Sequence, residues 1–174
     1  MISPVGSLSK SQSKQADLAH VSYAECLNEQ QNFADARREL RGFLEQHPRS
    51  AYTVRVHFAQ GWAAENLGTL DEAIEHYKKA TGDGTVVSAK AQFQIGQCLA
   101  AKKEHKDAIV EFLQIPSRYG YPEWSSRALL QVAGCFEALE EYQQSRKYYG
   151  EVIQRYPKRD EARLARERIG KLPE

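Results

Sequence analysis

The sequence predicts an all-α protein, an α-solenoid of four helix–turn–helix units followed by a C-terminal capping helix. Three observations predict this fold class. Apolar residues recur at helical steps of three and four, tiny residues recur in pairs 12 positions apart, and turn-forming residues separate the units. A pattern that repeats in this way indicates a repeat architecture with one supersecondary unit per period.

One stripe of apolar or small residues marks the second helix of each unit. In the second unit the stripe comprises Leu70, Ala73, Tyr77 and Ala80, at steps of three, four and three. Residues with this spacing lie on one face of an α-helix. The same steps recur at Phe33, Ala36, Leu40 and Phe43, at His105, Ala108, Phe112 and Ile115, and at Tyr142, Ser145, Tyr149 and Val152.

A second helical pattern precedes each stripe and carries one tiny residue of its own. That residue lies 12 positions before the tiny residue of the following helix in all four units. Antiparallel helices that cross closely need small side chains at the contact, because longer ones would hold the two axes apart. Each unit is therefore expected to form a tight helical hairpin. The pairs are Ala24 with Ala36, Gly61 with Ala73, Gly96 with Ala108, and Ala133 with Ser145.

Proline and glycine clusters predict where the helices end. Turns are expected at His47–Ser50, Gly82–Gly84, Pro116–Pro122 and Tyr156–Arg159. The expected helices span residues 14–30, 33–46, 50–67, 70–81, 85–102, 105–115, 122–139, 142–156 and 159–172. The solenoid domain is residues 14–174, with units at about 14–48, 50–84, 85–121 and 122–157.

The two ends of the chain differ in composition. Residues 1–13 are rich in Ser, Lys and Gln and are expected to form a flexible N-terminal linker. The ninth expected helix, at 159–172, has one apolar stripe and an opposite face of charged residues. A helix with one apolar face and one solvent-exposed face is expected to cap a stacked array. The stripe comprises Ala162, Ala165, Ile169 and Leu172.

The repeat resembles the tetratricopeptide repeat (TPR), a helix–turn–helix unit of ~34 residues. The match is closest at Gly68–Ala80, and Pro48 and Pro157 occupy the proline position that usually closes a unit. The resemblance covers about residues 14–157 and implies a right-handed superhelix that binds proteins. The long units and their Tyr-Pro or His-Pro endings are similar to a bacterial envelope-associated subgroup, which contains Tol–Pal-associated and outer-membrane assembly lipoprotein-like members. The sequence departs from the family at His105, which replaces an apolar residue.

Composition argues against several partner classes. Lys and Arg number 24 against 23 Asp and Glu, so no charge excess favours binding to nucleic acid. No apolar run approaches the ~20 residues of a membrane-spanning helix, and direct membrane insertion is not expected. No secretory signal is expected from the first residues of the sequence. We expect a soluble protein, cytoplasmic or periplasmic, with the compartment left open.

The sequence contains no pattern that indicates an enzyme. It has no zinc-binding HExxH motif and no phosphate-binding glycine loop, and its five histidines do not stand at metal-ligand spacing. We therefore expect no catalytic residues, metal, cofactor or small-molecule substrate. Cys26, Cys98 and Cys135 each follow the tiny residue of a first helix by two positions, so they are expected to be small core residues.

The concave face of a solenoid is its usual binding surface. In the TPR family the first helix of each unit lines that face, and the resemblance assigns one set of residues to it. Three aromatic residues of this set, Phe58, Trp62 and Phe93, would form an apolar patch. Beside it would lie a row of three cations, the ladder Arg55, Lys90 and Arg127. Alternatively, Phe58 and Trp62 pack into the core. The expected groove comprises Val21, Arg55, Phe58, Trp62, Lys90, Phe93, Gln97, Arg127 and Leu130.

These features predict a protein–protein interaction scaffold or adaptor. Its expected partner is a protein or peptide segment whose apolar side chains meet the aromatic residues and whose acidic side chains meet the cations. The carboxylate clamp of the TPR family is not expected, because Val21, Phe58 and Phe93 occupy corresponding positions. Two alternatives stay open: a self-assembling module that forms homo-oligomers, and a component of a bacterial envelope assembly or maintenance complex.

Overall fold

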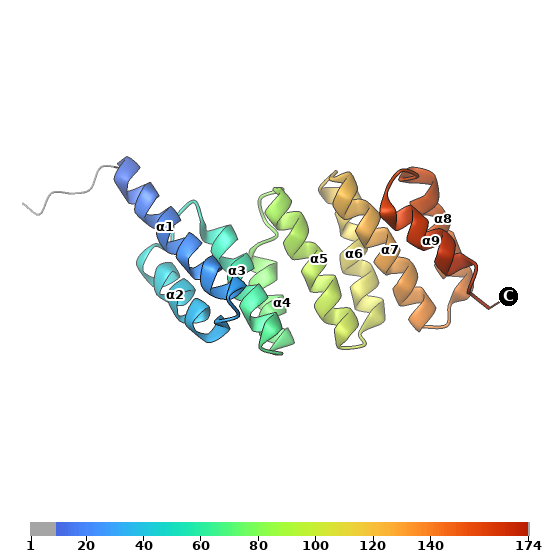
Figure 1. Cartoon of the computed structure of the whole chain (residues 1–174), viewed down its shortest axis with the longest axis horizontal. Coiled ribbons are helices and arrows are strands. Elements are labelled where there is room, and N and C mark those ends of the chain that lie inside the picture. Colours follow the sequence, from blue (N-terminus) through green and yellow to red (C-terminus); the bar gives the residue numbers. More distant parts are fainter. Residues whose placement is uncertain (1–9, 174) are drawn as a thin grey trace, which may run out of the picture.

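The computed structural model describes residues 10–173, which contain nine α-helices and no β-strand. The helices follow one another along the long axis of an elongated molecule, from α1 at one end to α9 at the other (Figure 1). The all-α prediction is confirmed. The helices are α1 (Lys10–Glu29), α2 (Phe33–Gln46), α3 (Thr53–Asn66), α4 (Leu70–Lys79), α5 (Val86–Ala101), α6 (His105–Arg118), α7 (Pro122–Ala138), α8 (Tyr142–Arg155) and α9 (Asp160–Ile169).

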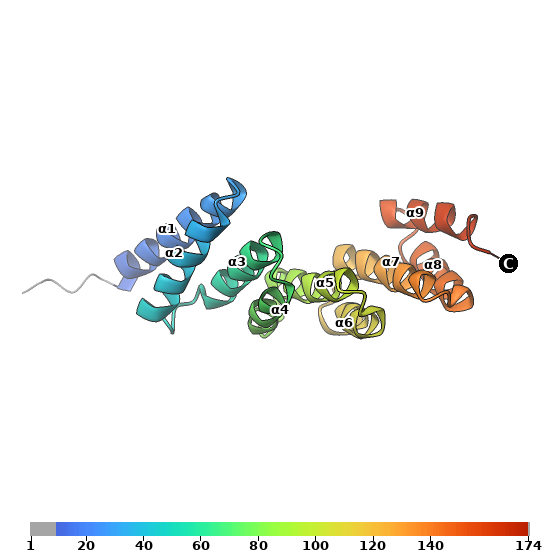
Figure 2. The same cartoon turned by 90° about the horizontal axis from the view of Figure 1, so that it is seen from below.

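The helices form two layers that give the molecule a hollowed face. Each odd-numbered helix contacts the next odd-numbered one, whereas α2, α4, α6 and α8 make no such contact with each other in the described part of the chain. The odd-numbered layer is therefore the more closely spaced one, and the stack curves toward it. In Figure 2 both ends of the molecule, at α1 and α9, rise on this side above α5. The predicted α-solenoid is confirmed, with first helices on its hollowed face.

Two of the tiny residues lie at close helix crossings, but each meets the aromatic residue one turn after its expected tiny partner. A Cβ atom at Gly61 would lie 2.6 Å from Cδ1 of Tyr77, and one at Gly96 would lie 2.6 Å from Cε1 of Phe112. Each aromatic ring therefore sits directly on the backbone of the partner helix. The other tiny residues are also fully buried: Ala24, Ala36, Ala73, Ala108, Ala133 and Ser145.

The core runs along the stack as a series of clusters, as expected of a solenoid. One cluster, for example, joins Ala73 and Tyr77 of α4 to Ile95 and Cys98 of α5. Each unit is thus completed by the first helix of the unit that follows it. The largest fully buried side chains are Tyr77, Phe43, Phe112, Leu40, Ile95 and Ile115.

The observed helix ends differ from the expected ones in several places. Helix α1 begins at Lys10, inside the segment 1–13 that was expected to be a linker. The rest of that segment, residues 1–9, lies outside the described residues. Helix α3 begins three residues later than expected, and α9 ends three residues earlier. None of these shifts changes the pairing of helices.

The turn expected to start at Pro116 begins later, because α6 continues through this proline to Arg118. Proline lacks the N–H group that would bond one turn back, but this loss occurs only once and in the last turn of the helix. Beyond it, the Tyr119 N–H donates to the Ile115 carbonyl at 3.1 Å. The chain reverses at Gly120, whose φ of 62° favours glycine.

Helix α9 packs its apolar stripe on α7 and α8, as predicted for a capping helix. Ala162 and Ala165 are fully buried, and Ile169 and Leu172 pack against the same cluster. Arg163 on the opposite face is exposed. Within residues 10–173 no helix combines the length and apolar character needed to cross a membrane.

The expectation that all three cysteines are core residues is wrong for one of them. Cys98 and Cys135 are buried, and burial raises the pKa of their thiols to about 12 and about 11. Cys26 is exposed. The equivalent residues Cys98 and Cys135 are covered by the unit that precedes each of them. The described residues contain no unit before α1. The face of α1 that bears Cys26 is therefore not covered by any described unit.

Candidate partner-binding surface

Two residues of the expected groove lie in the core instead. Val21 is fully buried beside Phe43, and Phe93 is only 8% exposed. The Phe93 ring lies 5.3 Å from the ring of Phe112 and 5.5 Å from that of Trp124 in the next unit. Both side chains point toward their own second helix and are covered by the following unit. The placement of both residues on the groove is therefore corrected.

The remaining aromatic residues of the expected patch are half-buried. The Phe58 ring packs 5.5 Å from Tyr77, and the Trp62 ring meets Phe33 edge-on at 6.5 Å. Gln97 is also half-buried. Part of each ring contributes to the core and part stays at the surface, so the apolar patch is smaller than the sequence indicated.

Ion pairs neutralise most of the expected ladder of cations. The Arg55 guanidinium donates to both carboxylate oxygens of Glu25, through Nε at 2.5 Å and through Nη2. These hydrogen bonds raise the pKa of Arg55. Glu25 comes from α1 and Arg55 from α3, so the pair joins two neighbouring first helices. It leaves no free charge for a partner at this position.

Arg127 is paired in a similar way. Its guanidinium lies 3.0 Å from a carboxylate oxygen of Glu123 and 3.4 Å from one of Glu161, and it stacks 4.9 Å over the Trp124 ring. Lys90 is the only one of the three ladder cations without a carboxylate partner among residues 10–173. The ladder is therefore reduced to one uncompensated charge.

One stripe of α7 lies open between α5 and α9 on the hollowed face. Two cavities, of about 580 Å³ and 500 Å³, lie along it. At 1.5 Å per residue the stripe is about 21 Å long. We call this surface the α7 groove. Its central residues, at steps of three and four, are Trp124, Arg127, Gln131, Gly134 and Ala138.

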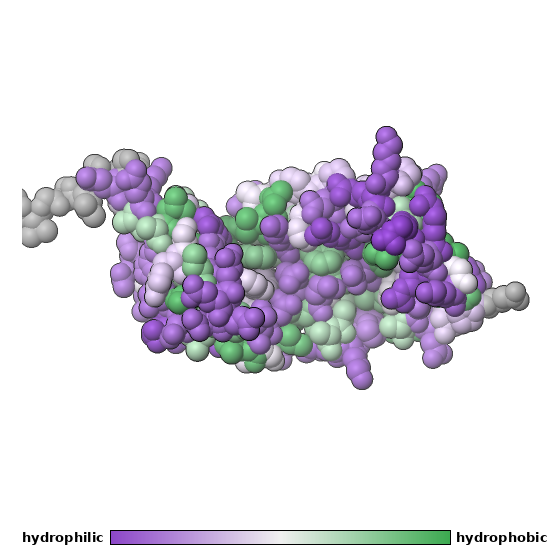
Figure 3. Space-filling model, in the orientation of Figure 1, coloured by the Kyte–Doolittle hydropathy of each residue, from purple (hydrophilic) through white to green (hydrophobic). Residues whose placement is uncertain are grey.

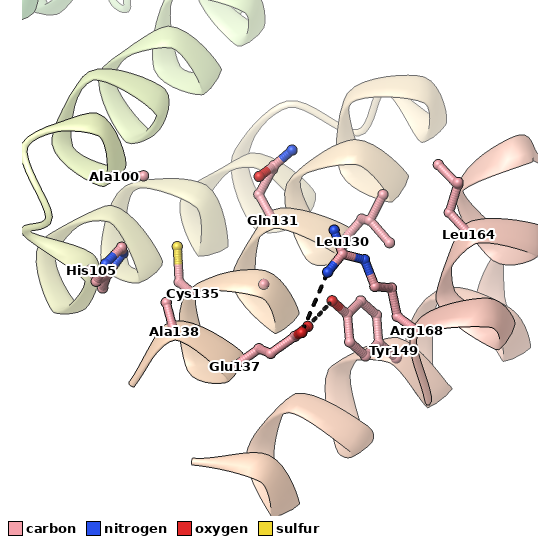
Figure 4. Close-up of a pocket in the computed structure, with 11 residues that line it drawn as sticks. Ala100, His105, Leu130, Gln131, Cys135, Glu137, Ala138, Tyr149, Leu164 and Arg168 are labelled. Carbon is pink, nitrogen blue, oxygen red and sulfur yellow. Dashed lines mark hydrogen bonds and ion pairs between the residues drawn. The ribbon is translucent and has the colours of Figure 1, made fainter. Parts of the chain in front are cut away.

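The larger cavity occupies the C-terminal half of the α7 groove. Leu130, Gln131 and Gly134 of α7 line it, and Leu164 and Arg168 of α9 form the opposite wall (Figure 4). Leu130 is thus the one expected residue that lines this cavity, and Leu164 is 40% exposed. On this face of the molecule, small hydrophobic areas alternate with hydrophilic ones (Figure 3).

A hydrogen-bonded triad forms the polar end of the larger cavity. The Tyr149 hydroxyl donates to Glu137 at 2.9 Å, and Nη1 of Arg168 lies 3.4 Å from the other carboxylate oxygen (Figure 4). Burial, together with this bond to Glu137, raises the pKa of Tyr149. The phenol therefore stays protonated and keeps the carboxylate in place. The triad also ties the capping helix to α7.

Several residues of the α7 groove were not predicted as site residues. Gln131 directly follows Leu130, so a full helical stripe could have included it. Gly134 occupies the same position of a first helix as Trp62 and Gln97, but it was not among the expected groove residues. Leu164 and Arg168 carried no such signal, because α9 was expected only to cap the stack. Its second role as a groove wall depends on the curvature of the stack, which the sequence pattern does not specify.

The α7 groove offers shape, apolar contacts and a few fixed polar groups. In the described part of the chain, no group of three or more His, Cys, Asp or Glu side chains is placed to hold a metal ion. The arrangement can bind a chain segment by complementarity, since peptide-binding grooves on helical proteins work in this way.

Comparisons with known proteins agree with this architecture. One sequence model of the family described as Tetratricopeptide repeat matches residues 27–86 and 58–115, and a second matches residues 127–159. No curated protein matches the chain. Two solved structures of MamA are similar to it. One has a TM-score of 0.66 and 20% identity over 81% of this chain and 73% of MamA. The other has a TM-score of 0.64 and 21% identity over 84% of each chain.

A third similar structure is that of PilF from Pseudomonas aeruginosa. It has a TM-score of 0.65 and 20% identity over 83% of this chain. The match spans 63% of the PilF chain. At such identities these likenesses show a shared fold.

Proposed function

The chain belongs to the tetratricopeptide repeat family, and we propose that it is a protein–protein interaction scaffold that holds a segment of a partner protein in the α7 groove. Helical repeat proteins use their hollowed faces as binding surfaces. The groove is long enough for about 14 residues of helix or six residues of extended chain. Its walls, α5 and α9, would contact both sides of such a segment.

The open space above Gly134 is the observation that carries this proposal. A Cβ atom at Gly134 would meet nothing within 4 Å, whereas Cβ atoms at Gly61 and Gly96 would clash with aromatic rings. Glycine inside a helix costs about 1 kcal/mol relative to alanine. Gly42 of α2 and Gly150 of α8 are equally open. Of these three helical glycines only Gly134 lines the larger cavity, where close approach of a partner's backbone to α7 would account for the missing side chain.

The chemistry of the larger cavity suggests what the segment carries there. Leu130 and Leu164 face it from opposite walls and would contact an apolar side chain. Gln131 offers an amide, and Arg168 has a side chain that is 60% exposed beside Glu137. The partner therefore presents an apolar residue flanked by hydrogen-bonding groups. This supports an apolar anchor in place of the aromatic patch expected from the sequence.

A random peptide library tests the proposal. Peptides of about 16 residues, longer than the groove, are selected by phage display on the wild-type chain. The Gly134→Leu variant places a side chain in the groove, and its Cβ meets nothing within 4 Å, so the selected peptides should bind it at least 10-fold more weakly. The matched control is Gly42→Leu on α2, where a Cβ also meets nothing within 4 Å. Equal binding to wild type and Gly134→Leu would remove the α7 groove as the binding surface.

A second candidate function, self-assembly, is supported by the outer stripe of α1. Tyr23 is 55% exposed and Cys26 is exposed, whereas the equivalent Ile95 and Cys98 of α5 are buried. A second copy could cover this stripe. Light scattering over a range of concentrations tests the idea: a mass that rises with concentration and is lowered by Tyr23→Glu supports it. A constant monomer mass excludes it.

A further inference from the structure

The smaller cavity, at the N-terminal end of the α7 groove, differs in chemistry from the rest of the groove. Its volume is about 500 Å³, and it lies where α5, α7 and α9 begin. Three cationic side chains line it against one carboxylate, that of Glu123. The cations are Lys90, Arg127 and Arg159.

Two of these three cations are not compensated. Arg127 is occupied by its ion pairs with Glu123 and Glu161. Lys90 and Arg159 have no carboxylate partner in the part of the chain that the structure describes. Arg127 holds two carboxylates, so the three cations and these two anions carry a net charge of +1. This excess gives the hollow a positive potential that attracts an anionic group.

The helix ends around this cavity add to its positive potential. The N-cap residues of α7 and α9, Tyr121 and Arg159, make no side-chain capping bond, so N–H groups in the first turns of both helices lack that partner. Pro122, the first residue of α7, has no N–H to contribute. Glu123 and Asp160 lie in these first turns and offset part of the effect. Helix α5 is different, because Thr85 caps it.

An aromatic wall completes the cavity. The Trp124 ring packs edge-on against Phe93 at 5.5 Å, and the Lys90 ammonium lies 5.9 Å from the Trp124 ring centroid. Tyr121 is held by a bond from its hydroxyl to the Gly84 carbonyl at 3.3 Å. These rings would contact the aliphatic part of a ligand, while the cations contact its charge.

We infer that this cavity binds an acidic side chain, Asp or Glu, of the same partner segment, and so fixes the direction of that segment in the α7 groove. The inference rests on the proposed function. The acidic end of the segment lies beside Lys90 and Arg159, and its apolar anchor lies about one to two helical turns away beside Leu130 and Leu164. The positions of the two cavities thus specify the order of acidic and apolar side chains along the partner segment, as well as their types.

The same phage library tests this inference on two further baits. Because the displayed peptides are fused through their C-termini, an anionic group can come only from a side chain. Wild type should enrich Asp or Glu at one end of the peptides and apolar residues toward the other. Peptides selected on the bait Lys90→Gln/Arg159→Gln should show no enrichment in acidic residues but should keep the enrichment in apolar residues. The control Lys78→Gln/Lys106→Gln removes the same charge from exposed sites outside the cavity and should select like wild type.

Affinities of one synthesised peptide give the quantitative result. Lys90→Gln/Arg159→Gln should weaken its binding about 10-fold at low salt, and the difference should shrink as salt is added. Replacing the acidic residues of the peptide by their amides should abolish the difference. Apolar enrichment without acidic enrichment on wild type would overturn this inference and leave the groove in place. Acidic enrichment that persists on the double variant would also overturn it, as would binding that requires a free C-terminal carboxylate. If the selected peptides bind wild type and Gly134→Leu with equal affinity, both the inference and the proposed function are removed.

Discussion

The substitution Gly96→Ala tests the packing of the helical hairpins most sharply. Its new Cβ would lie 2.6–2.7 Å from three ring atoms of Phe112, well inside the contact distance of about 3.5 Å between carbon atoms. The Phe112 ring is fully buried, so it has no free space to move into. Overpacking of this kind costs about 1–3 kcal/mol, and alanine in a helix regains about 0.5–1 kcal/mol. We expect a net loss of up to about 2.5 kcal/mol in the free energy of unfolding, with a central value of about 1 kcal/mol.

The matched control is Gly134→Ala, the same change in another first helix. A Cβ there meets nothing within 4 Å, so the variant should gain about 0.5–1 kcal/mol from helix propensity alone. Urea unfolding followed by circular dichroism at 222 nm gives both values. If Gly96→Ala stabilises the protein as Gly134→Ala does, then Phe112 does not sit on Gly96 and the register of the hairpin is wrong.

Three further predictions concern stability. Ala108→Leu should overpack the α5–α6 hairpin and cost about 1–3 kcal/mol, and an unchanged melting temperature would contradict the assigned helix contact. Burial lowers the pKa of His57, and lowers that of His76 to about 4, while their rings stack 5.8 Å apart. Because the unfolded histidines bind protons near pH 6.5, stability should be highest above that pH and fall between about 6.5 and 4. The urea midpoint measures this fall, and His76→Gln should reduce the slope; identical slopes would refute the assignment. Phe93→Ala should cost about 3–5 kcal/mol, as a buried ring does. A cost below 1 kcal/mol would place Phe93 on the surface.

Periodicity predicted the helices and their pairing because both depend on residues that are near in sequence. The 12-residue spacing from Gly61 to Ala73 predicted two closely paired helices, and Tyr77, one turn after Ala73, lies over Gly61. Helix ends were less predictable. Pro116 was expected to end a helix, but its cost is small in a last turn, and the sequence does not show how far that turn extends.

The binding surface was predicted less well because burial depends on residues one unit away. Phe93 belongs to the expected groove by its position in α5, yet Trp124 of the next unit covers it. Arg55 is likewise neutralised by Glu25, 30 residues earlier. That pair could have been anticipated, because Glu25 and Arg55 lie at neighbouring repeat positions in the first helices of two successive units. The wall that α9 provides follows from the curvature of the stack.

Mapping of amide chemical shifts with a library-selected peptide tests the central claim most directly. If a partner segment lies in the α7 groove, the largest shifts should fall on residues of α7 and α9, including Leu130, Gln131, Gly134 and Leu164. The amides of α2, α4 and α6, in the other layer, should change little. Shifts concentrated on that layer, with the α7 stripe unaffected, would contradict the account.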